Sequence, residues 1–244
     1  MRAILRIFLL FSVLSLSGQK GGNTIVEIDP DNVDGDFLAP YSNKWQAFLV
    51  DSLGREQLNL YWTDYAQLIN FKGEKCFHRV QELYTPDYNH RETWINMVEL
   101  PSMKPRFFQV FKASGQVMAV TFNGDKVRVA SNQNERHVLE TKEYKVAALC
   151  YDWNLYGLLL VALPFETGKR YALPFFDQTI GEMTTLQAKV GPQETITNLK
   201  GDPFDVWKIT TNQNLTFWIR KEPPYVMQTE LYYPNGTKLL WKTY

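Results

Sequence analysis

The chain has 244 residues, of which 45% are apolar and 14% aromatic, and its 26 Lys and Arg balance its 26 Asp and Glu. This composition is typical of a globular protein and excludes a disordered or collagen-like chain. Because there is no excess of positive charge, the electrostatic footprint of a nucleic-acid binder is missing, and binding to anionic lipid by charge alone is not favoured. We therefore expect no nucleic-acid partner.

Residues 1–18 predict a secretory signal peptide. Arg2 and Arg6 precede an apolar run from Ile7 to Leu16, and small residues follow it. The run has 10 residues, and a membrane-spanning helix needs about 20, so cleavage is favoured over a membrane anchor. Without this leader the chain carries 24 basic and 26 acidic residues. The pattern predicts an exported protein, periplasmic or secreted, with no integral membrane span after leader removal.

The rest of the chain predicts one domain. Residues 19–43 are polar and interrupted by Gly and Pro, which is typical of a linker or a lid. From Lys44 onward apolar residues recur mostly with a period of two, as in strands. The alternation continues on both sides of Asn123-Gly124, a strong signal for a β-hairpin. We therefore expect a single β-rich domain over residues 44–244.

The second half of the chain predicts a helix followed by a meander. Leu155 to Leu163 is apolar all round, with Asp152 or Asn154 as its cap and Pro164 at its end, which predicts a buried helix packed onto the sheet. Short turn-rich connections then separate four strand-like runs, which predicts antiparallel neighbours. These runs are residues 203–211, 215–221, 225–233 and 237–244.

Three tryptophans of this meander are candidate ligand-binding residues. Alternation along the strands can place Trp207, Trp218 and Trp241 on one face. A concave sheet lined in this way would hold an apolar ligand, because binding pockets are mostly aromatic and aliphatic. The alternative is that each of these side chains is ordinary core beneath the helix, since aromatic residues dominate protein cores.

From Tyr151 to Trp241 the order of motifs resembles a family of exported bacterial proteins known only as a domain of unknown function. The residues that carry the resemblance are Gln193-Glu194-Thr195, Gly201 with Phe204, Phe217-Trp218-Ile219 and Pro223-Pro224-Tyr225. The chain departs from the family in Gly201-Asp202-Pro203-Phe204, where members have a shorter turn. The resemblance implies a fold like the half-barrel of lipoprotein carriers. We therefore expect a mainly β protein: a large curved antiparallel sheet, forming an open half-barrel, with one or two packed helices.

No catalytic motif emerges, so we expect a protein that is not an enzyme. Ser114 lacks the flanking glycines of a nucleophile elbow, and the chain has no zinc-protease, dinucleotide or phosphate-loop motif. Cys76 and His78 are too few ligands for zinc. The acidic stretch Asp29–Asp36 does not match a calcium loop and predicts a solvated turn. We expect no metal and no cofactor.

Cys76 and Cys150 are the two cysteines of the chain. An oxidising compartment outside the cytoplasm permits a disulfide between them. The apolar neighbours of Cys150 favour the other interpretation, a buried free thiol. Sequence alone does not test the geometry that a disulfide requires, so both readings stay open here.

These observations favour an exported, non-catalytic binding protein that holds an apolar, lipid- or acyl-like ligand or a lipoprotein in a curved sheet. Its expected ligand-binding residues are Trp207, Trp218, Tyr225 and Trp241. The alternative is a structural or interaction protein of the cell envelope whose core is filled by its own side chains. A carrier should have an internal apolar volume that its own helix leaves empty, whereas an interaction protein should expose a large apolar patch.

Overall fold

The computed structural model describes residues 25–132, 138–146 and 150–244. In this part of the chain one continuous sheet of 16 strands surrounds a short helix. The expected fold, a large curved antiparallel sheet with packed helical segments, is confirmed. The strands of the first half are β1 (Ile25–Glu27), β2 (Tyr41–Val50), β3 (Glu56–Phe71), β4 (Glu74–Tyr84), β5 (His90–Glu99), β6 (Pro105–Lys112), β7 (Val117–Asn123), β8 (Lys126–Ser131) and β9 (Glu140–Lys145).

The second half supplies the helix and the remaining strands. They are β10 (Tyr151–Asp152), β11 (Arg170–Asp177), β12 (Glu182–Thr197), β13 (Pro203–Thr211), β14 (Leu215–Ile219), β15 (Val226–Tyr232) and β16 (Lys238–Thr243), with a 3₁₀ turn η2 (Trp153–Leu155) running into helix α1 (Tyr156–Val161). The four final strands match the expected meander, and β7 and β8 form the expected hairpin around Gly124.

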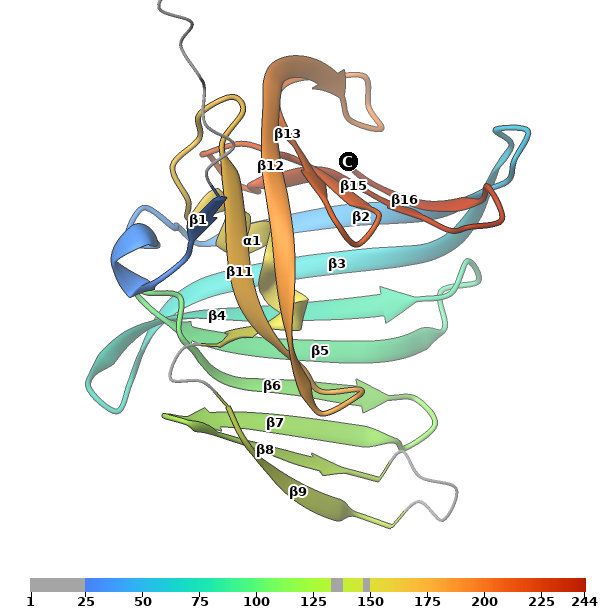
Figure 1. Cartoon of the computed structure of the whole chain (residues 1–244). Helices are drawn as coiled ribbons and strands as arrows, with labels where there is room; N and C mark the ends of the chain where they lie inside the picture. Colours follow the sequence, from blue (N-terminus) through green and yellow to red (C-terminus); the bar gives the residue numbers. More distant parts are fainter. Residues whose placement is uncertain (1–24, 133–137, 147–149) are drawn as a thin grey trace, which may run out of the picture.

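The sheet is ordered β1-β11-β12-β13-β14-β15-β16-β2-β3-β4-β5-β6-β7-β8-β9, with β10 paired beside β11. Strands β1 and β10 run parallel to β11, and the other pairs are antiparallel. Strand β16, the last in the chain order, therefore lies beside β2, the second, and this pairing joins the two halves of the chain into one surface. In Figure 1 strands β11 and β12 cross steeply over the nearly horizontal strands β3 to β6, with α1 between the two layers.

Helix α1 occupies the interior of the curved sheet. The expected cap residue, Asp152, caps the preceding turn η2, where its side-chain oxygen accepts a hydrogen bond from the backbone N–H of Asn154 at 3.0 Å. Helix α1 itself begins after Leu155 without a side-chain cap. Leu158, Leu159 and Leu160 are all buried, which agrees with the all-round apolar sequence. Phe217 and Val226 on the sheet pack in the same core. Within the described residues no helix is long and apolar enough to cross a membrane.

The segment before β2 is part of the fold. The expected leader, residues 1–18, and residues 19–24 lie outside the described residues. Residues 25–43 were expected to be a linker or a lid, yet Ile28, Val33 and Leu38 are buried in the main core. The backbone N–H of Asp34 donates to the carbonyl of Ala162 at 3.0 Å, which ties the segment to the end of α1. The apolar residues spaced along this polar stretch account for that packing, so the segment is not a free linker.

Candidate functional site

A cavity of about 390 Å³ lies between the η2–α1 segment and the inner face of the sheet. It falls in the size range of small-molecule sites, about 300 to 1,000 Å³. Its wall is strongly aromatic, although strands distant in the sequence contribute to it. The lining residues are Trp45, Trp62, Arg79, Gln81, Trp94, Trp153, Asn154, Tyr156, Gly157, Gln213, Leu215, Phe217, Val226, Thr229, Leu231 and Trp241.

Strand pairing brings the sheet tryptophans of this cavity together. Trp45 on β2 lies directly opposite Trp62 on β3, and the next inward position of β2, Ala47, lies opposite Trp241 on β16. Ala47 is fully buried, and its small side chain belongs to a cluster with Trp62, Trp94 and Trp241 around it. The rings of Trp62 and Trp94 meet edge to face at 5.3 Å between centroids. The inner face of β2, β3, β5 and β16 thus forms one continuous aromatic wall.

The helical segment closes the opposite side of the cavity. Trp153 in η2 packs edge to face against Tyr156 of α1, with centroids 4.5 Å apart. Tyr156 in turn meets Phe217 of the sheet at 6.2 Å. Gly157 faces the sheet so closely that a Cβ atom there would lie 2.8 Å from a methyl carbon of Val226. The helix therefore packs tightly against the sheet at Gly157, whereas the cavity lies about one helical turn away, beside Trp153.

A buried ion pair forms part of the polar wall of the cavity. Arg79 on β4 contacts Asp64 on β3 through two hydrogen bonds, from Nε to Oδ1 at 2.8 Å and from Nη2 to Oδ2 at 2.5 Å. The exposed fraction of the Asp64 side chain is 1%, and that of Arg79 is 10%. The hydroxyl of Tyr41 also donates to Asp64, at 3.1 Å. Burial by itself would lower the pKa of Arg79, but the adjacent carboxylate outweighs it and the pKa is raised, so the guanidinium stays charged.

Gln81 links this ion pair to the tryptophans. Its amide satisfies its neighbours in the orientation in which the oxygen accepts from Trp62 Nε1 at 3.0 Å and from Arg79 Nη2 at 2.7 Å. A polar network therefore runs from Tyr41 through Asp64, Arg79 and Gln81 to the aromatic wall. Buried polar groups that hydrogen-bond each other in this way fix the orientation of the side chains that carry them.

The structure separates the residues expected to bind a ligand. Trp241 lines the cavity, and its indole Nε1 is buried with no hydrogen-bond partner among the described residues. Trp207 faces the interior but packs against Phe165, with centroids 5.6 Å apart, outside the cavity lining. Tyr225 is a fully buried core residue whose hydroxyl accepts a hydrogen bond from the backbone N–H of Ala39.

Trp218 lies on the outer face of the sheet, so the expectation that three tryptophans share one face is wrong. Its strand neighbours Phe217 and Ile219 belong to the main core, whereas Trp218 packs in a separate cluster with Val206 and Met227. Its indole N–H donates to the carboxylate of Glu194. The strand is apolar on both faces, because this second cluster covers part of the outer surface.

Four cavity tryptophans were not expected from the sequence: Trp45, Trp62, Trp94 and Trp153. A signal for three of them exists in the period-two pattern. On β2, Trp45 belongs to the same buried face as Asn43 and Ala47, with more exposed residues between them. Trp62 and Trp94 occupy inward positions of their own strands. Trp153 carries no such signal, since its position depends on how η2 enters the interior.

The other residues singled out from the sequence are the two cysteines and the acidic stretch Asp29–Asp36. Cys76 and Cys150 are both buried free thiols, so the disulfide considered from the sequence is not formed in this structure. Burial raises the pKa of the Cys150 thiol to about 11. In the acidic stretch, Asp29 caps the short 3₁₀ turn at residues 30–32 by accepting from two backbone N–H groups. The described residues hold no cluster of three or more His, Cys, Asp and Glu suited to a metal ion.

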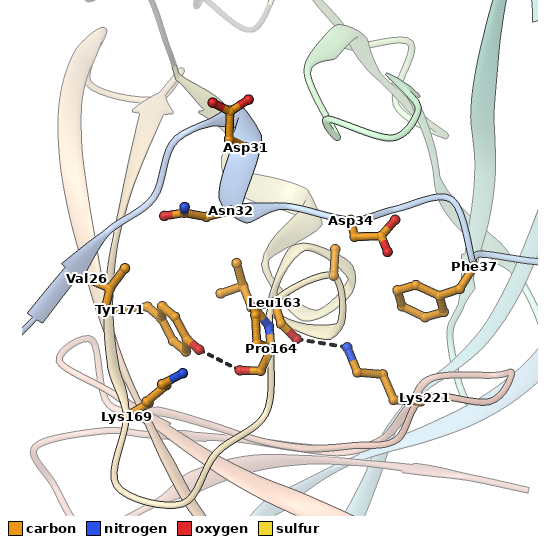
Figure 2. A pocket seen from close by; sticks show the side chains of 11 residues that line it. Val26, Asp31, Asn32, Asp34, Phe37, Leu163, Pro164, Lys169, Tyr171 and Lys221 are labelled. Carbon is orange, nitrogen blue, oxygen red and sulfur yellow. Dashed lines mark hydrogen bonds between the residues drawn. The ribbon is translucent and has the colours of Figure 1, made fainter.

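A larger cavity, of about 780 Å³, lies at the other end of α1 (Figure 2). Asp31, Asp34, Lys169 and Lys221 stand around it, so its wall is far more polar than the tryptophan cavity. Lys221 donates to the carbonyl of Leu163 at 2.8 Å, and its ammonium lies 4.8 Å from the centre of the Phe37 ring. These contacts cap the C-terminal end of the helix, where carbonyl groups lack partners within the helix. We therefore assign Lys221 a structural role at this end of the helix.

The curved sheet and inner helix define a half-barrel protein with an aromatic cleft beside the helix. The chain belongs to the family described as "Protein of unknown function (DUF3108)", whose match covers residues 66–239. The expected membership of a domain-of-unknown-function family is thereby confirmed. No curated protein matches the chain significantly.

Solved structures similar to this one include the following three. A β-barrel-like protein of the domain of unknown function DUF1849 from Brucella abortus is 11% identical, with 85% of this chain and 96% of that chain covered and a TM-score of 0.47. A candidate lipoprotein from Parabacteroides distasonis is 10% identical, with 86% and 97% covered and a TM-score of 0.39. A candidate exported protein with a YmcC-like fold from Bacteroides fragilis is 8% identical, with 87% and 97% covered and a TM-score of 0.39.

Proposed function

We propose that this protein is an exported, non-catalytic carrier that holds an apolar, lipid- or acyl-like ligand inside its curved sheet. One observation carries the proposal: the cavity of about 390 Å³, whose lining includes five tryptophans. An aromatic wall of this kind offers a large apolar contact area to a ligand. Export is supported by the basic and apolar pattern of residues 1–18.

The cavity also bears on the choice between a carrier and a self-filled envelope protein. Helix α1 fills the interior around Leu158 and Leu160, which are fully buried. Beside Trp153 and Trp241 it leaves a cleft that opens to solvent and that no side chain fills. The apolar side chains that line such a cleft keep surface that a ligand can bury. An apolar ligand in the cleft would remove that surface from water, which favours the carrier.

The test combines native mass spectrometry with two matched variants. The chain is purified from its own envelope fraction and its mass compared before and after organic extraction. The extracted protein is then titrated with a fluorescent fatty-acyl probe. Thr229→Phe places a ring in the cavity, whereas Gln228→Phe places the same ring on the opposite face of β15. We expect an extractable lipid mass, and uptake of the probe reduced about tenfold or more by Thr229→Phe alone, because the new ring would occupy space that the ligand needs. A tenfold loss corresponds to about 1.4 kcal/mol of binding free energy.

Two results would overturn the carrier proposal. The first is a clean apoprotein mass together with no uptake of the probe by the extracted chain. That result would favour the alternative, an interaction protein of the envelope. The second is equal probe uptake by the Thr229→Phe and Gln228→Phe variants, with both variants folded by circular dichroism, because binding would then take place outside the cavity.

A further inference from the structure

The polar wall of the tryptophan cavity contains hydrogen-bond donors that the protein itself does not use. The Nε of Arg79 donates to Asp64, and its Nη2 donates to both Asp64 and Gln81. The Tyr41 hydroxyl also interacts with the guanidinium, but among the described residues no acceptor forms a well-aligned hydrogen bond with Nη1. A guanidinium group has five N–H donors, and two of them are on Nη1. Because Arg79 lines the cavity, these two donors are available to a ligand.

The charge of Arg79 is already neutralised. Asp64 sits against it in a bidentate contact with almost no exposure to water. A ligand carboxylate at Nη1 would add a second negative charge beside Asp64, with no further cation among the residues that line the cavity. Two carboxylates at one buried site repel each other, and removing an uncompensated charge from water is costly. A carbonyl oxygen accepts the same hydrogen bonds without adding charge.

We propose that the ligand is an uncharged amphiphile whose polar end presents an ester or amide carbonyl to Arg79, and not a fatty-acid anion. This inference rests on the carrier function proposed above and defines the chemical class of its ligand. The apolar chain then lies against the aromatic wall formed by Trp45, Trp62 and Trp241. The Asp64–Arg79 pair acts as a selectivity element, because it supplies donors while cancelling the charge that would attract an anion.

The test compares two ligands with the same chain and different heads. Extracted full-length protein is titrated with methyl dodecanoate and with dodecanoate at pH 8, where the acid is ionised, and tryptophan emission reports binding. We expect the ester to bind about tenfold more tightly or better, because the anion meets Asp64. Trp218→Phe serves as the optical control, since it removes a fluorophore on the outer face of the sheet.

Two variants change the polar end of the site alone. Asp64→Asn removes the carboxylate that contacts Arg79 and leaves only the more distant charge of Asp152 to oppose the guanidinium, so the preference should shift about tenfold or more towards dodecanoate. The double variant Asp64→Asn, Arg79→Gln removes both charges of the ion pair together. In that protein both the ester preference and the ester affinity should fall, because the Nη1 donors are gone. If either variant is unfolded by circular dichroism, the other variant and the wild-type comparison still decide the proposal.

The outcomes separate this inference from the carrier proposal. Failure of the wild-type protein to bind either ligand would contradict both. Binding of dodecanoate as tightly as the ester would overturn the inference and leave the carrier function intact. An ester preference that the folded variants do not alter would also overturn it, because the selectivity would then come from residues other than Asp64 and Arg79.

Discussion

Asp152 and Asn96 meet inside the curved sheet, where the Asn96 amide donates to Oδ2 of Asp152 at 2.5 Å. Both residues are 1% exposed. Asp152 is also the cap of the η2 turn that leads into α1. The contact therefore joins the start of the inner helix to strand β5, and it leaves a carboxyl group buried next to the tryptophan cavity.

Asp152 should make the stability of the protein depend on pH. Burial raises the pKa of its carboxyl group to about 6, from an ordinary value of 3.8, in spite of the hydrogen bonds that lower it. The folded state holds this proton more tightly than the unfolded state does. The resulting stabilisation is complete below about pH 4 and is lost as the pH rises through about 6, by up to about 3 kcal/mol for a shift of two pKa units. Urea unfolding between pH 4 and pH 8 measures it.

The Asp152→Asn variant should remove that pH dependence. An amide keeps the acceptor for the Asn154 backbone and carries no charge at any of these pH values. Its NH₂ group can pair with Asn96 once that side chain rotates, since Asn96 Oδ1 has no partner among the described residues. We expect the variant to be more stable than the wild type at pH 8. A variant that keeps the wild-type slope of stability against pH would show that another group is responsible.

Gly157→Ala should destabilise the protein although alanine is the better helix former. The new methyl group would lie 2.8 Å from Cγ2 of Val226. Overpacking of this kind costs about 1 to 3 kcal/mol, and the gain in helix propensity is about 1 kcal/mol. We expect a net loss of about 1 kcal/mol, measured by urea unfolding. In the double variant Gly157→Ala, Val226→Ala the two losses should not add, because the clash is removed. Full additivity would contradict the packing argument.

Lys221→Met should weaken the attachment of α1 at its C-terminal end. The variant loses the hydrogen bonds to the carbonyls of Val161 and Leu163 and the contact with Phe37. We expect a loss of about 1.5 kcal/mol, at the lower end for hydrogen bonds to a charged group. Lys169→Met is the matched control, since Lys169 lines the same cavity but pairs with the exposed Glu166. Such surface pairs contribute about 0 to 1 kcal/mol. Equal losses in the two variants would show that the helix cap is unimportant.

Cys76 and Cys150 should resist alkylation in the folded protein. Both thiols are buried, and burial raises the pKa of each, so little of the reactive thiolate is present at neutral pH. We expect no labelling by iodoacetamide of the native chain at pH 7 and two labels after unfolding without reductant. Two labels that appear only when a reductant is added would instead reveal a disulfide. Mass spectrometry distinguishes the two results.

Local signals allowed the sequence to predict many elements. Asn123-Gly124 indicated a hairpin, and the short connections after Thr211 and Ile219 indicated antiparallel neighbours. The helix around Leu158 followed from its apolar run, although Asp152 caps the η2 turn before it and not α1 itself. In each case neighbouring residues in the sequence determine the local conformation.

The cavity could not be predicted in the same way. Period-two alternation shows which residues share a face but not which face is inside, and β14 is apolar on both. Trp218 was therefore placed with the inward residues. Trp45 and Trp241 come together only because β16 pairs with β2. That pairing joins residues nearly 200 positions apart, and no local pattern specifies it.

The pairing of β16 with β2 also gives the sheet a seam of long sequence separation. Lys242 on β16 lies opposite Gln46 on β2. Strands β2 to β9 can pair by successive hairpins, whereas this edge of β2 needs a partner nearly 200 residues away. Contacts of such long separation form slowly, and unpaired strand edges favour aggregation. The aromatic wall, which Trp45 and Trp241 share across this seam, therefore depends on a contact of the kind that forms slowly.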